Sequence, residues 1–188
     1  MTAALWFIAG CWITLVIYWT VAARSAKASV QRQGGLTRAQ HVITLAAAGA
    51  LLIVPRWPYP LSLVVVPHGP AADGGGAALC LCGLLVAIWA RRTLGGNWSS
   101  AVTFKQGHEL ILRGPYNYVR HPIYTGLLMM ALGTAVAIGR LHAWLGLLLC
   151  VVGFWVKLRQ EETLMVREFP DLYPAYRRRV KALVPFVI

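Results

Sequence analysis

The chain has 188 residues, of which 58% are hydrophobic and only 13% are charged. A soluble domain carries about 25% charged residues, so a protein this poor in charge cannot face water all round and is expected to lie in a membrane. Its net charge of +12 does not indicate nucleic-acid binding, because no base-reading motif accompanies it and the cytoplasmic loops of membrane proteins accumulate Lys and Arg.

The first two apolar segments predict the N-terminal spans. Residues 3–23 are long enough to cross a bilayer, and no basic region precedes them, so they suit a span better than a cleavable signal peptide. Residues 42–54 are short for a span. This helix either begins in the polar segment near Thr37 or continues in broken form past the prolines that follow. The glycine triplet at 74–76 is predicted to end a flexible loop.

Three further apolar segments complete the membrane domain: residues 77–90, 122–138 and 143–156. The connection between the last two is so short that they are expected to form an antiparallel helical hairpin. We therefore predict an all-α, polytopic integral membrane protein with about five transmembrane helices and a cytoplasmic C-terminal segment. The chain forms a single membrane domain, with the N-terminal spans in residues 1–75 and a core in residues 76–188.

The distribution of positive charge predicts the orientation. Five spans place the loops alternately on two sides of the membrane. Of the 18 Lys and Arg residues, only Arg56 and Arg140 fall on the side of the N-terminus. The positive-inside rule then puts the N-terminus outside and the C-terminus in the cytoplasm, and we expect a multi-pass protein of the bacterial inner membrane.

The four cysteines lie within apolar segments and show no metal-ligand spacing with histidine. They are interpreted as small apolar packing residues, and no metal site is predicted. These cysteines are Cys11, Cys80, Cys82 and Cys150.

Residues 114–126 combine a turn with a dense group of polar and aromatic side chains. Pro122 suits the first position of a helix, and the residue before a proline is pushed out of the helical region. His121 is therefore expected at a helix N-terminus, where free backbone donors attract anionic groups. Taken singly, such residues are typical of an interfacial belt on lipid headgroups, but their number within ten residues weakens that interpretation. The group comprises Tyr116, Tyr118, Arg120, His121, Tyr124 and Gly126.

A second polar segment follows the last predicted span and begins with Glu161 and Glu162. Lys157 precedes Glu161 by one helical turn, in the less favourable orientation for a stabilising ion pair. A solvated helix end would explain these residues, but ionisable side chains at membrane depth are functional candidates. The basic tail at residues 177–181 is expected to rest on anionic membrane lipids.

Together these segments resemble the isoprenylcysteine carboxyl methyltransferase family and related membrane phospholipid methyltransferases. The resemblance covers roughly residues 80–188, and the motifs occur in the family's order beside predicted spans. Residues 94–99 also resemble the family's stretch after its central span. The motifs are Gly114-Pro115-Tyr116, Arg120-His121-Pro122-x-Tyr124-x-Gly126, Glu161-Glu162-x-Leu164 and Tyr173-x-x-Tyr176-x-x-Arg179-Val180.

The resemblance implies S-adenosylmethionine as methyl donor, S-adenosylhomocysteine as product, and a cofactor pocket enclosed by the hairpin and the C-terminal segment. It implies a cofactor-binding set of Tyr118, Arg120, His121, Pro122, Tyr124, Gly126, Tyr173 and Tyr176, and a catalytic set of Lys157, Arg159, Glu161 and Glu162. We expect Glu161 to orient or deprotonate the acceptor, assisted by Lys157 or Arg159.

The acceptor is expected to be a small lipophilic molecule or a lipid that presents a carboxylate, thiol or amine. Eukaryotic members of the family carry arginine at the position of Lys157. The lysine keeps the charge but lacks the planar fork suited to a carboxylate, which disfavours a prenylcysteine-type carboxylate acceptor.

Two other functions compete with methyl transfer. A membrane reductase that uses NADPH could share a sterol-reductase-like core, although such enzymes commonly have longer chains and more spans. A small membrane transporter or assembly protein would place polar groups within its spans, where Thr14 and Thr44 are the main ones. Polar chemistry is instead concentrated at one edge of the membrane, which favours an enzyme.

Overall fold

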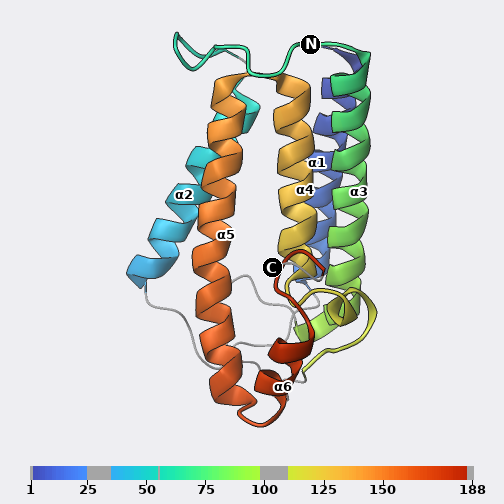
Figure 1. Ribbon diagram of the computed structural model, residues 1–188, viewed down its shortest axis with the longest axis vertical. Helices are drawn as coiled ribbons and strands as arrows, with labels where there is room; N and C mark the ends of the chain where they lie inside the picture. Colours follow the sequence, from blue (N-terminus) through green and yellow to red (C-terminus); the bar gives the residue numbers. More distant parts are fainter. Residues whose placement is uncertain (1, 25–34, 55, 98–109, 186–188) are drawn as a thin grey trace.

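The computed structural model describes residues 2–24, 35–54, 56–97 and 110–185, apart from the side chains of residues 35–38 and 97. Trp98 and Ser99 of the motif at 94–99 therefore lie outside the described residues. The described chain is all-α, as predicted, and forms an elongated bundle (Figure 1). Its elements are α1 (Ala3–Ala23), α2 (Gly35–Ile53), α3 (Pro70–Leu94), η1 (Gly95–Asn97), η2 (Gly114–Asn117), α4 (Pro122–Ile138), α5 (Leu141–Glu168) and α6 (Leu172–Arg179).

Three of the helices, α1, α3 and α5, are long and apolar enough to cross a membrane. Two shorter apolar helices accompany them, α4 and residues Ala39–Ile53 of α2. The first helix has the predicted bounds, and α4 and α5 form the predicted hairpin, with Gly139 ending α4 in the left-handed region at a φ of 68°. The protein is thus a multi-pass helical membrane protein.

Helix α2 decides a point that the sequence left open, and helix α3 corrects a prediction. Helix α2 begins at Gly35 and ends at Ile53, so the first alternative is correct and the helix does not continue past the prolines. Helix α3 begins at Pro70, so the prediction that residues 74–76 end a loop is wrong. Pro70 and Asp73 in the first turn both favour a helix start at this point.

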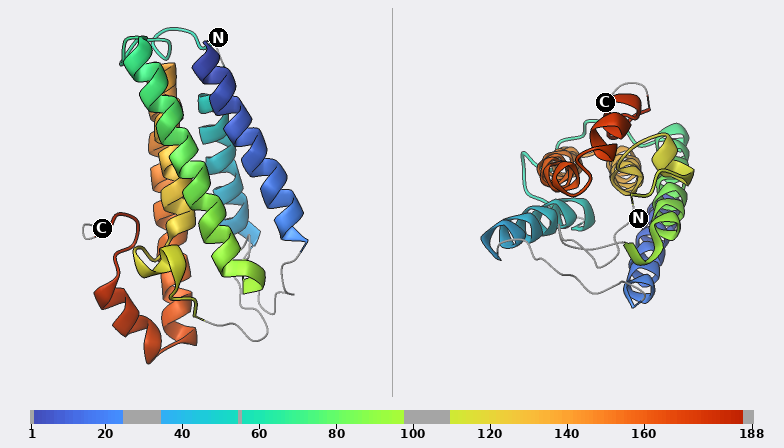
Figure 2. Two further views of the ribbon diagram at one scale, coloured as in Figure 1. Left: turned by 90° about the vertical axis from the view of Figure 1, so that its right-hand side faces the viewer. Right: turned by 90° about the horizontal axis from the view of Figure 1, so that it is seen from below.

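Helix α4 lies at the centre of the bundle and packs on two sides. On one side it joins α1 and α3 around Cys80 and Met130, and on the other it joins α2 and α5 around Ala48 and Phe154. Figure 2 shows this arrangement from the side and from below, where α6 lies beside the ends of α4 and α5.

Glycines allow α3 and α4 to pack with their backbones in contact. A Cβ atom on Gly126 would lie 2.6 Å from the carbonyl oxygen of Gly83, and one on Gly83 would lie 2.5 Å from the carbonyl oxygen of Gly126. Gly76 makes a similar contact with Gly133, since its Cβ would lie 2.6 Å from that carbonyl oxygen. At Gly76 the missing side chain is therefore needed for packing against α4, not for flexibility.

Adding a methyl group at this contact is expected to destabilise the protein. Gly83→Ala should lower the free energy of unfolding by roughly 1–3 kcal/mol, because backbone atoms of α4 cannot move aside as a flexible side chain could. Thermal unfolding in detergent micelles measures the effect. Gly49→Ala is the matched control, since nothing lies within 4 Å of a Cβ at this position on α2. Equal melting temperatures for the two variants would contradict the role of the glycine contact.

Candidate active site

The start of α4 places His121 as predicted. His121 is the residue before the helix, with a φ of −124° and ψ of 59°, and Pro122 occupies the first turn. The short helix η2 leads into this point from Gly114, which has a φ of 62°. Pro122 therefore fixes the start of α4. The imidazole of His121 lies at the polar end of the bundle rather than inside a span.

The C-terminal segment that follows α6 is bound to the start of α4. The backbone N–H of Arg120 donates to the carbonyl of Lys181 at 2.8 Å, and that of His121 donates to the carbonyl of Ala182 at 3.0 Å. The Thr125 hydroxyl donates to the carbonyl of Leu183 at 2.7 Å. Residues 180–183, here called the C-terminal strap, thus cover this end of α4.

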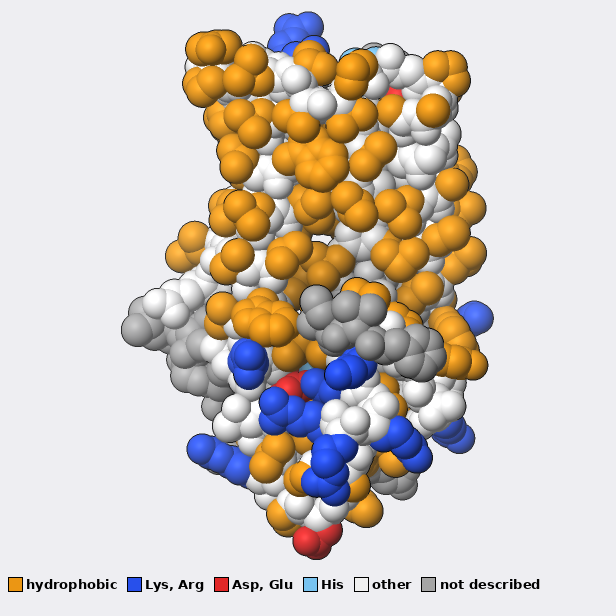
Figure 3. All heavy atoms as spheres, in the orientation of Figure 1, with side chains coloured by type: hydrophobic (Ala, Val, Ile, Leu, Met, Phe, Trp, Pro, Cys, Tyr) orange, Lys and Arg blue, Asp and Glu red, His pale blue; other side chains and the backbone are white. Residues whose placement is uncertain are grey.

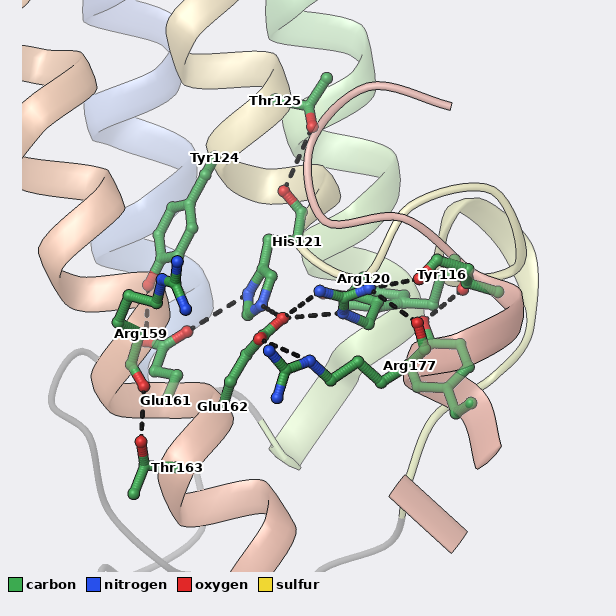
Figure 4. Close-up of polar contacts among 12 residues, drawn as sticks. Tyr116, Arg120, His121, Tyr124, Thr125, Arg159, Glu161, Glu162, Thr163 and Arg177 are labelled. Carbon is green, nitrogen blue, oxygen red and sulfur yellow. Dashed lines mark hydrogen bonds and ion pairs between the residues drawn. The ribbon is translucent and has the colours of Figure 1, made fainter. Parts of the chain in front are cut away.

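Arg120 forms the central ion pair of the site with Glu162 (Figure 4). Its Nε and one terminal nitrogen donate to Oε1 of Glu162 at 2.7 and 2.5 Å. Its other terminal nitrogen donates to the carbonyls of Val180 and Arg177. Both charged side chains are buried, with exposures of 8% and 5%. All three guanidinium nitrogens have partners within the protein, so Arg120 holds Glu162 and the strap in place.

His121 lies between the two glutamates. Its Nδ1 is 3.6 Å from Oε2 of Glu161, and its Nε2 is 3.4 Å from Oε1 of Glu162. The second contact is close enough for an ion pair, but Nε2 is buried and has no directed hydrogen bond within the described chain. Burial alone disfavours the charged imidazolium, but hydrogen bonding and charge from Glu161 and Glu162 outweigh it and raise the pKa of His121 above its usual 6.5.

Glu161 is bound by a second set of residues. The hydroxyl of Tyr124 donates to Oε1 of Glu161 at 2.5 Å, and Nζ of Lys157 lies 4.0 Å from the same oxygen. The ring of Tyr124 stacks between His121, at a centroid distance of 5.6 Å, and Phe154, at 5.0 Å. Phe154 was not predicted, although it lies two helical turns before Glu161 and hence on the same face of α5.

The structure brings Lys157, Glu161, Glu162, His121 and Tyr124 together, but it places other predicted residues elsewhere. The guanidinium of Arg159 lies over the ring of Trp155, 5.0 Å from its centroid, and not against Glu161. Tyr118 is exposed. Gly126 lies at the contact with α3.

The two predicted tyrosines of α6 are buried in a separate small core against α5. Tyr173 and Tyr176 pack edge to face with Met165 and Phe169 beside them. The hydroxyl of Tyr176 donates to the carbonyl of Tyr116 at 2.5 Å, which ties α6 to η2. Through this core, α6 is positioned against the site.

One member of the basic tail belongs to the site, which the sequence did not predict. Nε of Arg177 lies 3.4 Å from Oε2 of Glu162, so this arginine faces the protein as well as its surroundings. A cleft of about 340 Å³ opens on this side of Glu162. It is lined by Arg159, Glu162, Thr163, Val166, Arg167 and Arg177.

We expect the stability of the folded protein to depend on pH, because the fold favours the protonated form of His121. Because the pKa of His121 is higher in the folded protein than the usual 6.5, the stabilisation is complete below pH 6.5 and is lost as the pH rises through the folded value. We therefore expect the melting temperature to fall as the pH is raised from 6.5 towards 9. His121→Gln should remove this part of the profile, whereas His68→Gln, at the opposite end of the bundle, should retain it. An identical profile in His121→Gln would show that the imidazolium does not stabilise the fold.

Fold and site together define the class of protein. It is a multi-pass helical membrane protein, and a cluster of acidic, histidine and tyrosine side chains lies where its spans reach the basic end of the bundle. Residues 76–167 match the model of the isoprenylcysteine carboxyl methyltransferase (ICMT) family. This match confirms the resemblance seen in the sequence for the part of the chain that contains His121, Tyr124, Glu161 and Glu162.

Individual relatives agree with the family match. A protein-S-isoprenylcysteine O-methyltransferase of Schizosaccharomyces pombe is 34% identical over 96 residues, which are 50% of this chain and 41% of the relative. The Xenopus laevis protein of the same name is 27% identical over 122 residues, covering 60% and 40% of the two chains. The matched part is thus less than half the length of either relative.

A solved structure shares the fold. It is described as the eukaryotic intramembrane Ras methyltransferase ICMT, and it superposes with a TM-score of 0.59 at 22% identity. The superposition covers 79% of this chain and 53% of the other.

Proposed function

We propose that the protein is a membrane methyltransferase that uses S-adenosylmethionine and methylates a lipophilic small molecule or lipid. The observation that carries this proposal is the group of buried His121 and Tyr124 with half-buried Glu161 beside the Arg120–Glu162 pair, within the segment that matches the ICMT family. The names of the matched relatives favour methyl transfer over an NADPH-dependent reductase or a transporter.

We also propose that the chain crosses the bacterial inner membrane five times, with the N-terminus outside. Lys and Arg side chains gather at the end of the bundle that carries α6, opposite the N-terminus (Figures 1 and 3). This asymmetry supports a cytoplasmic C-terminus. Reporter fusions to the C-terminus test it: alkaline phosphatase should be inactive and green fluorescent protein fluorescent. Active phosphatase at the C-terminus would contradict the orientation.

The residues around His121 include groups that suit the proposed cofactor. The carboxylate of Glu161 attracts a sulfonium cation. The buried Nε2 of His121, which lacks a directed hydrogen bond, is available to a polar group of a ligand. When bound, S-adenosylmethionine supplies an electrophilic methyl group on a positively charged sulfur.

Within this proposal, Glu161 acts on the acceptor and Glu162 maintains the site. Glu161 has Tyr124, Lys157 and His121 around its carboxylate, which fix its orientation. An amine or thiol acceptor must lose a proton, and Glu161 is the base available for it. A carboxylate acceptor has no proton to lose, and Glu161 would then orient it only.

Binding and transfer are tested with the purified full-length protein. S-adenosylhomocysteine should raise the melting temperature and bind in calorimetry, whereas NADPH should do neither. Incubation with tritiated S-adenosylmethionine and membrane extract should label a lipophilic product that mass spectrometry identifies. Absence of both S-adenosylhomocysteine binding and labelled product would overturn the proposal, and binding of NADPH alone would favour the reductase.

A further inference from the structure

The cleft on the outer side of Glu162 has an excess of positive charge. Its lining contains three arginines, Arg159, Arg167 and Arg177, and one acidic residue, Glu162. We call it the arginine cleft. Figure 3 shows its setting, with Lys and Arg side chains gathered around an acidic group at this end of the molecule.

Most of this charge is not neutralised within the described chain. Oε1 of Glu162 is taken by Arg120, and its Oε2 faces Arg177. Arg159 and Arg167 form no ion pair with any acidic side chain that the structure describes. The Thr163 hydroxyl donates to the carbonyl of Arg159. The guanidinium groups of Arg159 and Arg167 can therefore donate hydrogen bonds to a bound anion.

The number of arginines favours a phosphate group. One guanidinium suffices to bind a carboxylate in a bidentate manner, whereas several around one point match the three oxygens and double charge of a phosphate monoester. With Glu162 included, the lining carries a net charge of about +2, which a phosphate dianion would neutralise.

An apolar strip on α5 leads to the cleft from the membrane side. Leu148, Val152 and Trp155 are exposed and recur every three or four residues, so they lie on the helix face that continues into Arg159 and Thr163. The guanidinium of Arg159 lies over the Trp155 ring where the strip meets the cleft. A molecule with an anionic head and a hydrocarbon chain could contact both surfaces at once.

We propose that the arginine cleft binds the phosphate group of a membrane-borne amphiphile whose hydrocarbon chain lies along the Leu148–Val152–Trp155 strip. The strip adds apolar contact that a free phosphate ion cannot make, and Arg159 and Arg167 supply the charge-assisted hydrogen bonds. This binding site can be tested apart from the methyl-transfer chemistry, because no ion pair joins Arg159 or Arg167 to Glu161 or Glu162 in the described part of the chain.

The test titrates the purified full-length protein in a neutral detergent with three probes. Lysophosphatidic acid carries a phosphate monoester and an acyl chain, lysophosphatidylcholine of the same chain length has its phosphate charge balanced by choline, and inorganic phosphate has no chain. Native mass spectrometry gives the number bound and the Kd. We expect one lysophosphatidic acid molecule to bind at least about tenfold more tightly than either of the other probes.

Two variants and a control locate the site. Arg159→Gln and Arg167→Gln should each weaken lysophosphatidic acid binding by roughly tenfold, the loss of one charge-assisted interaction. Arg178→Gln, an exposed residue of α6 that does not line the cleft, should leave the Kd unchanged. Equal weakening in all three variants would mean non-specific attraction and overturn the proposal.

The other outcomes are also decisive. Inorganic phosphate binding as tightly as lysophosphatidic acid would exclude a membrane-borne ligand, and equal binding of lysophosphatidylcholine would exclude selection for a phosphate monoester. Displacement of lysophosphatidic acid by S-adenosylhomocysteine would assign the cleft to the cofactor and overturn the inference. If the unaltered protein binds lysophosphatidic acid but shows no methyl transfer, the result counts against the proposed function and not against the arginine cleft.

Discussion

For an amine or thiol acceptor, Glu161→Gln is expected to lower kcat for methyl transfer by about 100- to 10,000-fold, the usual contribution of a general base. Glutamine keeps the shape of the side chain and can still accept the hydrogen bond from Tyr124, but it cannot take a proton and no longer carries the charge that faces His121 and Lys157. The measurement is a single-turnover assay with the acceptor identified by labelling, together with S-adenosylhomocysteine binding to show that the site still forms.

A matched control is available on the same helix. Glu168→Gln makes the same chemical change at the exposed end of α5 and should retain full activity. The kinetic pattern also reports on the acceptor. If the acceptor is an amine or thiol, Glu161→Gln should lower kcat and abolish its dependence on pH, whereas for a carboxylate acceptor KM should rise instead. Full activity of Glu161→Gln would leave this residue with a structural role only.

Glu162→Leu is expected to lower the free energy of unfolding by about 3–5 kcal/mol. The substitution would leave Arg120 buried without a counter-ion, and it would remove the ion-pair contacts to His121 and Arg177. Urea or thermal unfolding in detergent micelles measures the effect. Glu168→Leu and Arg178→Leu, both on exposed positions, should each change the stability by about 0.5 kcal/mol or less.

A double substitution separates a buried ion pair from simple loss of contacts. Glu162→Leu combined with Arg120→Leu leaves neither charge of this pair buried without a counter-ion. The double variant should therefore lose less free energy of unfolding than the two single variants lose in sum. It should not be zero, because Arg120 also donates to the carbonyls of Val180 and Arg177 and thereby holds the C-terminal strap. Additive costs would show that the two side chains do not depend on each other for burial.

These two predictions assign different roles to adjacent glutamates. Successive residues on a helix point about 100° apart, so Glu161 and Glu162 meet different surroundings. Glu162 faces the strap and is held by Arg120, whereas Glu161 faces the stacked ring of Tyr124. The sequence could not decide between them, because both lie at the same membrane depth and in the same motif.

The sequence by itself determined the features that depend on neighbouring residues. The bounds of α1, the position of His121 before Pro122 and the hairpin of α4 and α5 were all predicted correctly. Each follows from a local rule: the length of an apolar segment, the restriction that proline places on its neighbours, or the shortness of a connection. The chemical character of the site was predicted for the same reason, since its residues stand in two short segments.

Only the tertiary structure decided which side chains meet. The sequence placed Arg120 in the cofactor-binding set but gave no partner for it within the chain, and the structure pairs it with Glu162, 42 residues away, and the carbonyl of Val180, 60 residues away. Arg159 was expected at the reaction centre and lies over Trp155, whereas Arg177 was expected on lipid and faces Glu162. The physical reason is that a buried charge needs a partner that compensates for lost hydration, and the packing of α5, α6 and the strap determines which partner is within reach.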